Sequence, residues 1–149
     1  MTRKNAREYA VQLVYTLGFT DDAPGDLLDT ALSPDAFARL EGEDALYAKP
    51  PDADQAAYIR RLVCGVAEHQ PELDSYIERF AVGWRFGLIP RVAVSIMRVC
   101  MYEVLYTHDV PYRAAMNEAV EIAKKYEPHE VVSFINGILG SFFRNEAPQ

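Results

Sequence analysis

The chain has 149 residues, half of them apolar, and a formal net charge of −7. This length suits a single compact domain, and no apolar run approaches the roughly 18 residues that a membrane span requires. The first residues are basic and polar, without the apolar core of a secretory signal, so we expect a cytoplasmic protein with no membrane association.

The acidity belongs to one part of the chain. Residues 1–20 carry three basic side chains against one acid, a net charge of +2, whereas residues 21–54 carry ten acids against two basic side chains, a net charge of −8. The remaining residues, 55–149, are almost neutral at −1. Because a phosphate group responds to the local field, the overall charge does not exclude nucleic-acid binding at the amino terminus.

The hydrophobic pattern at the amino terminus predicts a helix over residues 3–17. Apolar side chains recur there at helical spacing, and Gly18 follows as a plausible stop. This register leaves Arg3, Lys4 and Arg7 on the solvent side of the helix.

Two further elements are expected before the middle of the chain. A second helix is predicted over residues 26–32, after which Ser33 suits an N-cap and Pro34 the first residue of another helical turn or two. Residues 42–54 contain paired prolines, which supply no backbone donors and hold the chain extended. We therefore expect a loop there; the sequence leaves the role of its acidic part, 41–54, open.

The second half of the chain is also helical in pattern, and no stretch alternates at period two. Strongly apolar residues make the helix that follows Pro90 the expected centre of the core. About seven helices without a repeat favour an all-α orthogonal bundle. The helices expected here cover 54–68, 71–81, 90–107, 112–126 and 130–144.

Catalytic and metal-binding patterns are not apparent. Cys64 and Cys100 each lie inside an apolar helical pattern without zinc-ligand spacing, so we interpret both as reduced core residues. The three histidines are scattered, and the sequence contains neither a glycine-rich phosphate loop nor a nucleophile motif. The expectation is a protein that is not an enzyme and uses no metal or cofactor.

Two asparagines stand beside strongly apolar neighbours. Asn117 and Asn136 are interpreted as buried amides that tie helix ends together, while Gly137 is expected to let another helix approach closely. Arg98 and Glu103 are expected to join the same internal polar network. Ligand contact by the asparagines is the alternative.

The basic residues of the first helix have two interpretations. Positive charge at a helix amino terminus is mildly unfavourable for the helix, so Arg3, Lys4 and Arg7 do not serve its stability. Gln12 and Tyr15 follow on neighbouring turns, and an amide and an aromatic ring are groups that read and stack unpaired bases. The alternatives are a merely solvated helix start and a half-buried Tyr15.

Five segments resemble one family. The residues that carry the resemblance are Arg3-Lys4-Asn5-Ala6-Arg7-Glu8, Tyr102-Glu103-Val104-Leu105, Asp109-Val110-Pro111-Tyr112, Asn117-Glu118-Ala119-Val120-Glu121-Ile122-Ala123-Lys124 and Phe134-Ile135-Asn136-Gly137-Ile138-Leu139. Their order and spacing resemble the NusB family of transcription antitermination factors. The match is dense from about Arg98 to Leu139, and it departs from the family at Asn5 and Ser133, where a basic residue is usual or frequent.

The resemblance implies a fold and a function. It implies two packed helical subdomains within one RNA-binding domain over 1–149, and binding of single-stranded boxA RNA from ribosomal RNA leaders together with the ribosomal protein NusE, within an RNA polymerase antitermination complex. The implied RNA-binding residues are Arg3, Lys4, Arg7, Gln12 and Tyr15, and the implied partner-binding residues are Tyr15, Glu130 and Phe134.

Two other functions remain open at this point. Similar domains form the RNA-binding part of ribosomal RNA cytosine methyltransferases, but such an enzyme needs a separate methyl-donor domain, and this chain ends at Gln149. A purely protein-binding helical adaptor or a homodimer is the other alternative.

Overall fold

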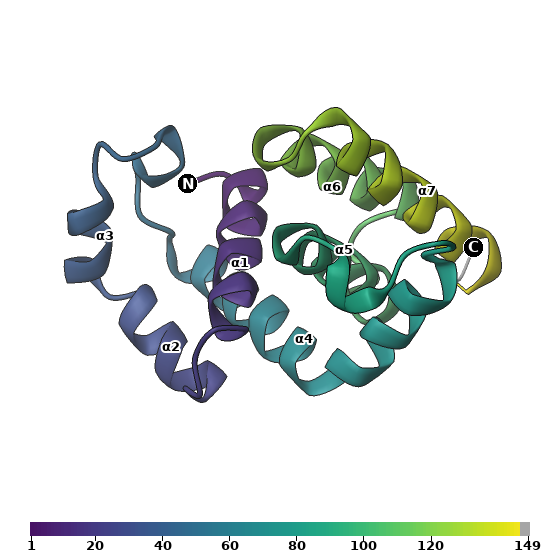
Figure 1. Ribbon diagram of the computed structural model, residues 1–149. Helices are drawn as coiled ribbons and strands as arrows, with labels where there is room; N and C mark the ends of the chain where they lie inside the picture. Colours follow the sequence, from purple (N-terminus) through teal and green to yellow (C-terminus); the bar gives the residue numbers. More distant parts are fainter. Residues whose placement is uncertain (147–149) are drawn as a thin grey trace. The chain divides into compact units, whose positions relative to one another are not determined.

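The computed structural model describes residues 1–146, and every regular element among them is helical (Figure 1). Seven α-helices are joined by loops and three short helical turns, which confirms the expected all-α fold class. The helices are α1 (Arg3–Leu17), α2 (Pro24–Ala31), α3 (Pro34–Leu40), α4 (Ala53–Phe80), α5 (Arg91–Tyr102), α6 (Tyr112–Tyr126) and α7 (His129–Asn145), and the short turns are η1 (Ala45–Tyr47), η2 (Phe86–Leu88) and η3 (Glu103–Thr107).

The chain divides into two compact units. The amino-terminal unit, Met1–Ala67, contains α1 to α3, η1 and the first half of α4. The carboxy-terminal unit, Glu68–Gln149, contains the second half of α4 and the elements from η2 to α7. Each unit has its own set of buried apolar side chains.

Three aromatic rings form the centre of the amino-terminal unit. Tyr9, Phe37 and Tyr47, here called the Tyr9 cluster, meet nearly edge to face, with ring centroids 5.4 to 6.0 Å apart. The Tyr9 hydroxyl donates to the carbonyl oxygen of Ala31 at 2.8 Å. Burial, with a smaller contribution from Tyr47, raises the pKa of Tyr9 to about 12, so the hydroxyl stays a donor at neutral pH. The cluster thereby connects α1 to the end of α2, to α3 and to η1.

The helix ends in this unit follow the local sequence. Gly18 caps α1, and its N–H donates to the carbonyl oxygen of Tyr15 at 3.1 Å. At α3, the Ser33 side chain accepts from the backbone N–H of Ala36 at 3.2 Å, and Pro34 is the first helical residue. Both helix ends confirm the predicted signals. At α3, the Ser33 hydroxyl satisfies a backbone N–H that would otherwise lack a partner, and Pro34 has no backbone N–H to satisfy.

The fourth helix differs from the prediction. Residues 54–68 and 71–81 were expected to form separate helices, but α4 runs without interruption from Ala53 to Phe80 with Pro71 inside it. Proline lacks the N–H that would reach the Ala67 carbonyl, so the helix loses one bond of its ladder there. The boundary between the two units falls directly after Ala67. The prediction that a new helix starts at Pro71 is therefore wrong.

The carboxy-terminal unit is built around α5, as predicted. Ten consecutive residues, 93–102, are buried, and α5 packs against both α6 and α7, which also pack against each other (Figure 1). The helix continues through η3 and ends at His108, which takes the left-handed conformation with φ 56°. A left-handed residue at this position closes a helix, although glycine adopts it at less cost.

An ion pair links α5 to the second half of α4. The guanidinium of Arg98 donates to both carboxylate oxygens of Asp74, from Nε at 2.7 Å and from Nη2 at 2.9 Å. Arg98 is buried, and its planar fork matches the carboxylate. Arg98 therefore takes part in an internal polar contact, as expected, but its partner comes from α4.

The expected network of buried asparagines is wrong. Asn117 and Asn136 are both exposed, and a side chain added at Gly137 would meet no atom within 4 Å. The apolar neighbours in sequence point into the core from adjacent helical positions, so they do not bury the asparagines. Glu103, by contrast, is fully buried as expected.

Two smaller findings concern exposure. Cys100 is a buried free thiol as predicted, whereas Cys64 is exposed on α4, which corrects its interpretation as a core residue. Among residues 1–146, no helix has the length and apolar character needed to cross a bilayer.

Candidate nucleic-acid interface

The amino terminus of α1 is fixed by a cap. The hydroxyl of Thr2 accepts from the backbone N–H of Asn5 at 3.0 Å, so Arg3 and Lys4 occupy the first helical turn. That turn contains no acidic residue. The positive end of the helix dipole and two cationic side chains therefore coincide, an arrangement that costs helix stability but attracts phosphate.

Arg3 is held by an aromatic ring from α4. Its guanidinium carbon lies 3.7 Å from the centroid of the Tyr58 ring, while Tyr58 itself is buried. Such a cation–π contact orients the guanidinium, and Arg3 as a whole remains exposed. Lys4 is also exposed. Sequence analysis did not identify Tyr58 as a partner of Arg3, since its place among apolar residues at helical spacing in α4 indicates only a core residue.

Arg7 does not lie where the sequence predicted. It is only 6% exposed, so its assignment to the solvent side of the helix is wrong. Its guanidinium carbon lies 5.9 Å from the same Tyr58 ring. A buried arginine loses most of its ability to pair with phosphate in solvent, so Arg3 and Lys4 become the principal candidates for RNA contact.

Gln12 is already engaged within its own unit. The Tyr47 hydroxyl donates to Gln12 Oε1 at 2.6 Å, which connects α1 to η1. The side chain is half-buried. Its predicted role in reading bases requires this contact to coexist with, or yield to, the RNA.

Tyr15 lies at the other end of α1. Its ring is 37% exposed and approaches the ring of Phe19, which is 63% exposed, with centroids 4.9 Å apart. Twelve residues separate Tyr15 from Arg3, a distance of about 18 Å along a helix. The structure therefore places an exposed aromatic pair at one end of α1 and the cations at the other.

In the carboxy-terminal unit, Glu130 and Phe134 lie one turn apart on α7. Glu130 is exposed in the first turn, where a carboxylate is favoured by the helix dipole. Phe134 is half-buried, and its ring packs against Trp84 with centroids 4.6 Å apart. Phe134 is therefore not simply a core residue.

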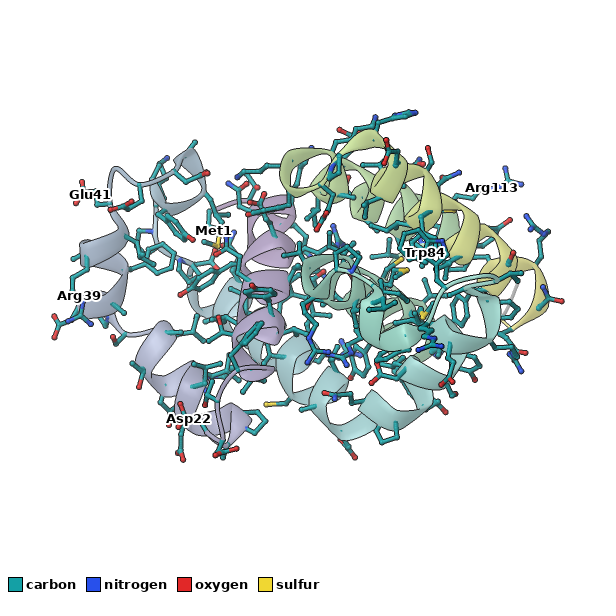
Figure 2. The ribbon with its side chains drawn as sticks, in the orientation of Figure 1. Met1, Asp22, Arg39, Glu41, Trp84 and Arg113 are labelled. Atoms are coloured by element: carbon teal, nitrogen blue, oxygen red, sulfur yellow. The ribbon has the colours of Figure 1, made fainter. Side chains whose placement is uncertain are left out.

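The segment before α5 presents Trp84 and other apolar side chains to solvent. Gly83 has φ 85°, which glycine adopts readily, and the N–H of Trp84 donates to the carbonyl oxygen of Ala81 at 3.1 Å. The turn leaves Trp84 47% exposed, and Val82 and Leu88 are more exposed still. Trp84 is labelled in Figure 2. Sequence analysis missed this surface, although Trp84 between Gly83 and Gly87 was an available signal.

The described side chains offer no alternative metal chemistry. No group of three or more histidine, cysteine or acidic side chains in residues 1–146 is arranged to hold a metal ion.

Comparison with known proteins identifies the family. A model of the NusB family matches residues 4–144. Transcription antitermination protein NusB of Clostridium perfringens is 36% identical over 145 residues, which cover 97% of this chain and 98% of that protein. The solved structure of T. maritima NusB has a TM-score of 0.77 at 25% identity, covering 99% of this chain and 94% of that one.

A further likeness concerns the fold alone. A chain in a crystal structure of antitermination factors NusB and NusE in complex with dsRNA has a TM-score of 0.73 at 22% identity, covering 95% of this chain and 96% of that one. The family match extends over nearly the whole chain, from Lys4 in the first turn of α1 to Arg144 near the end of α7. The chain belongs to the NusB family of transcription antitermination proteins.

Proposed function

We propose that this protein binds single-stranded boxA-type RNA of ribosomal RNA leaders together with the ribosomal protein NusE, and that it acts in the cytoplasm within an RNA polymerase antitermination complex. The protein is a non-enzymatic antitermination factor by family. A related structure contains NusB, NusE and RNA, which supports the same two partners for this chain.

One observation carries the RNA part of the proposal. The Thr2 cap, Arg3 held on the Tyr58 ring, and exposed Lys4 concentrate positive charge at the start of α1. The first turn of α1 contains no acidic residue, and positive charge at a helix amino terminus does not stabilise the helix. A phosphate backbone is the ligand that suits it.

The partner part rests on two exposed aromatic surfaces. In the amino-terminal unit Tyr15 packs with Phe19, and in the carboxy-terminal unit Phe134 packs with Trp84, with Glu130 one turn before Phe134. Exposed aromatic side chains are frequent anchors at protein interfaces, and a carboxylate beside them suits a basic ribosomal protein.

The test is RNA affinity measured by fluorescence anisotropy with labelled boxA RNA, with and without NusE, over a range of salt concentrations. The double variant Arg3→Ala/Lys4→Ala should lose most of the affinity. If each side chain contacts one phosphate, the slope of log affinity against log salt should fall in magnitude by about 1.4. An unchanged slope would exclude the start of α1 from the RNA site.

Arg39→Ala/Lys49→Ala is the matched control. Both side chains are exposed in the same unit, and Arg39 projects outward from α3 (Figure 2). Their replacement removes the same amount of positive charge as Arg3→Ala/Lys4→Ala. This control should keep the wild-type slope. If no RNA binds at any salt concentration, with or without NusE, a protein-binding adaptor replaces the proposed function.

A further inference from the structure

A depression lies in the carboxy-terminal unit, between the start of α6 and the end of α7. Its volume is about 290 Å³, near the lower limit of small-ligand sites, which suits a group the size of one base. α6 and α7 pack against each other, and all the lining residues belong to these two helices. The lining residues are Tyr112, Arg113, Met116, Gly140, Phe143 and Arg144.

The interior of this depression is aromatic and apolar. The rings of Tyr112 and Phe143 lie with their centroids 5.2 Å apart at 48° to each other. Phe143 is buried and Tyr112 is half-buried, so the tyrosine ring is the more accessible of the two. Aromatic side chains of this kind stack with any nucleobase.

The rim of the depression is cationic. Arg113 projects outward at the start of α6 (Figure 2), and its Nε donates to the Tyr112 hydroxyl at 3.2 Å. The exposed Arg144 donates from Nη2 to the Ser141 hydroxyl at 3.2 Å. Each arginine is thus oriented by a neutral hydroxyl, and within residues 1–146 neither forms an ion pair with an acidic side chain.

The start of α6 adds to this positive rim. Its N-cap is Pro111, and no described side chain caps the first turn. The backbone N–H groups of that turn and the helix dipole therefore favour an anion beside Arg113. Two arginines and a helix start beside an aromatic depression have the charge pattern of a site for a nucleotide, which combines an aromatic base with a phosphate.

We propose that this depression binds one nucleotide of an RNA strand, with its base against Tyr112 and Phe143 and its phosphate between Arg113 and Arg144. The choice of RNA as the source of the nucleotide rests on the proposed function. The site itself is separate in sequence from the start of α1 and adds a second point of contact for RNA.

Gly140 keeps the depression open. A Cβ built there would lie 3.4 Å from Arg144 Nη1 and 3.9 Å from Met116 Cε. These are contacts with the ends of flexible side chains, so alanine fits without disturbing the helix, and it has a higher helix propensity than glycine. Gly140→Ala should therefore keep or raise the melting temperature while it narrows the site.

The first experiment uses free nucleoside 5′-monophosphates and follows backbone amide shifts by NMR. Adenosine and uridine monophosphate should shift amides at the start of α6 and the end of α7 in the wild type. Arg113→Ala/Arg144→Ala should weaken this binding about tenfold or more, since a hydrogen bond to a charged group contributes at least that factor. Gly140→Ala should weaken it without loss of stability, an outcome that a purely structural role would not give.

The second experiment separates the RNA strand from the free nucleotide. RNA should lose affinity in Arg113→Ala/Arg144→Ala, and the salt slope should fall by about 1.4, whereas the matched control Arg91→Ala/Lys124→Ala should retain both. Nucleotide binding without this loss would mean that the source is a free nucleotide, which would overturn the RNA assignment. An absence of shifts at α6 and α7 would overturn the site itself.

Failure of the proposed function gives a different result. If Arg3→Ala/Lys4→Ala leaves RNA affinity and its salt slope unchanged, the start of α1 is not the RNA site. The nucleotide shifts at Tyr112 and Arg144 do not depend on that outcome. The two proposals therefore fail separately.

Discussion

Two of the aromatic groups in the protein differ in their exposure. In the Tyr9 cluster, Tyr9 and Phe37 are buried and meet Tyr47 edge to face, and two hydroxyl groups are used in hydrogen bonds within the amino-terminal unit. In the carboxy-terminal unit, Trp84 packs on Phe134 but remains 47% exposed.

The difference shows how similar residue types take different roles. Each ring of the Tyr9 cluster touches two others, and its tyrosine hydroxyls tie separate segments together. Trp84 follows a left-handed glycine, and although its ring contacts Phe134, nearly half of its surface stays in water. We infer that the Tyr9 cluster stabilises the fold and that the Trp84–Phe134 pair serves binding.

The largest effect should come from Phe37→Ala. Removing a buried phenyl ring typically costs 3 to 5 kcal/mol, and we expect a loss of about 3 kcal/mol in the free energy of unfolding. The lower end applies because a cavity of about 470 Å³ beside Phe37 admits solvent and reduces the void that the variant creates. Urea denaturation measures this loss. A loss no larger than that of Phe134→Ala would contradict the assigned difference between the two groups.

Trp84→Ala should have the reverse effect. Loss of an aromatic anchor at an interface typically costs about 2 kcal/mol of binding, or roughly 30-fold in affinity, whereas the free energy of unfolding should change by less than about 1 kcal/mol. Isothermal titration with NusE and a urea titration give both values. Leu88→Ala is the control, since Leu88 is exposed in the same segment. Equal affinities for wild type and Trp84→Ala would assign this surface to something other than NusE.

Tyr9→Phe should cost about 1 kcal/mol of stability at neutral pH, because it removes one partly buried hydrogen bond. The wild type should also lose stability as pH rises from 10 towards 12. The unfolded state releases the tyrosine proton near pH 10, whereas the folded state holds it until about 12. Unfolding measured at pH 8, 10 and 11 should show a smaller decline in the variant. Parallel declines would mean that Tyr9 does not titrate differently in the folded protein.

The helical fold could be predicted because its signals are local. Caps such as Ser33, stops such as Gly18 and the buried run of α5 each depend on a few neighbouring residues. Pro71 misled the prediction because a helix tolerates proline when the surrounding residues continue it. The effect of a proline on the backbone hydrogen bonds of a helix depends on the surrounding structure, which a rule based on the proline alone does not include.

The candidate site was harder to predict because exposure depends on distant segments. Which side of α1 is buried depends on segments far away in the sequence, so local patterns did not show that Arg7 is buried. Asn136 was predicted to be buried because its sequence neighbours are apolar, but its exposure depends on the face of α7 on which it lies. The exposure of Asn136 and Gly137 also reverses an expectation about mutants. Gly137→Val should not overpack the core, since open space surrounds its position.

The smallest effect distinguishes a partner surface from a solvated helix end. Glu130 is exposed in the first turn of α7, so Glu130→Lys should lower stability by no more than about 1 kcal/mol through the helix dipole. If a basic partner docks there, the association rate with NusE should fall several-fold at low salt, and the difference should shrink as salt screens the charges. Stopped-flow measurements at two salt concentrations test this.

Glu78→Lys provides the matched control, because Glu78 is exposed on α4 in the same unit and its reversal changes the net charge equally. A general effect of protein charge would slow both variants alike, since long-range steering depends on the whole field. A local interface slows only Glu130→Lys. Identical association rates for Glu130→Lys and the wild type would place Glu130 outside the NusE surface, and Trp84 and Phe134 would then have to bind without it.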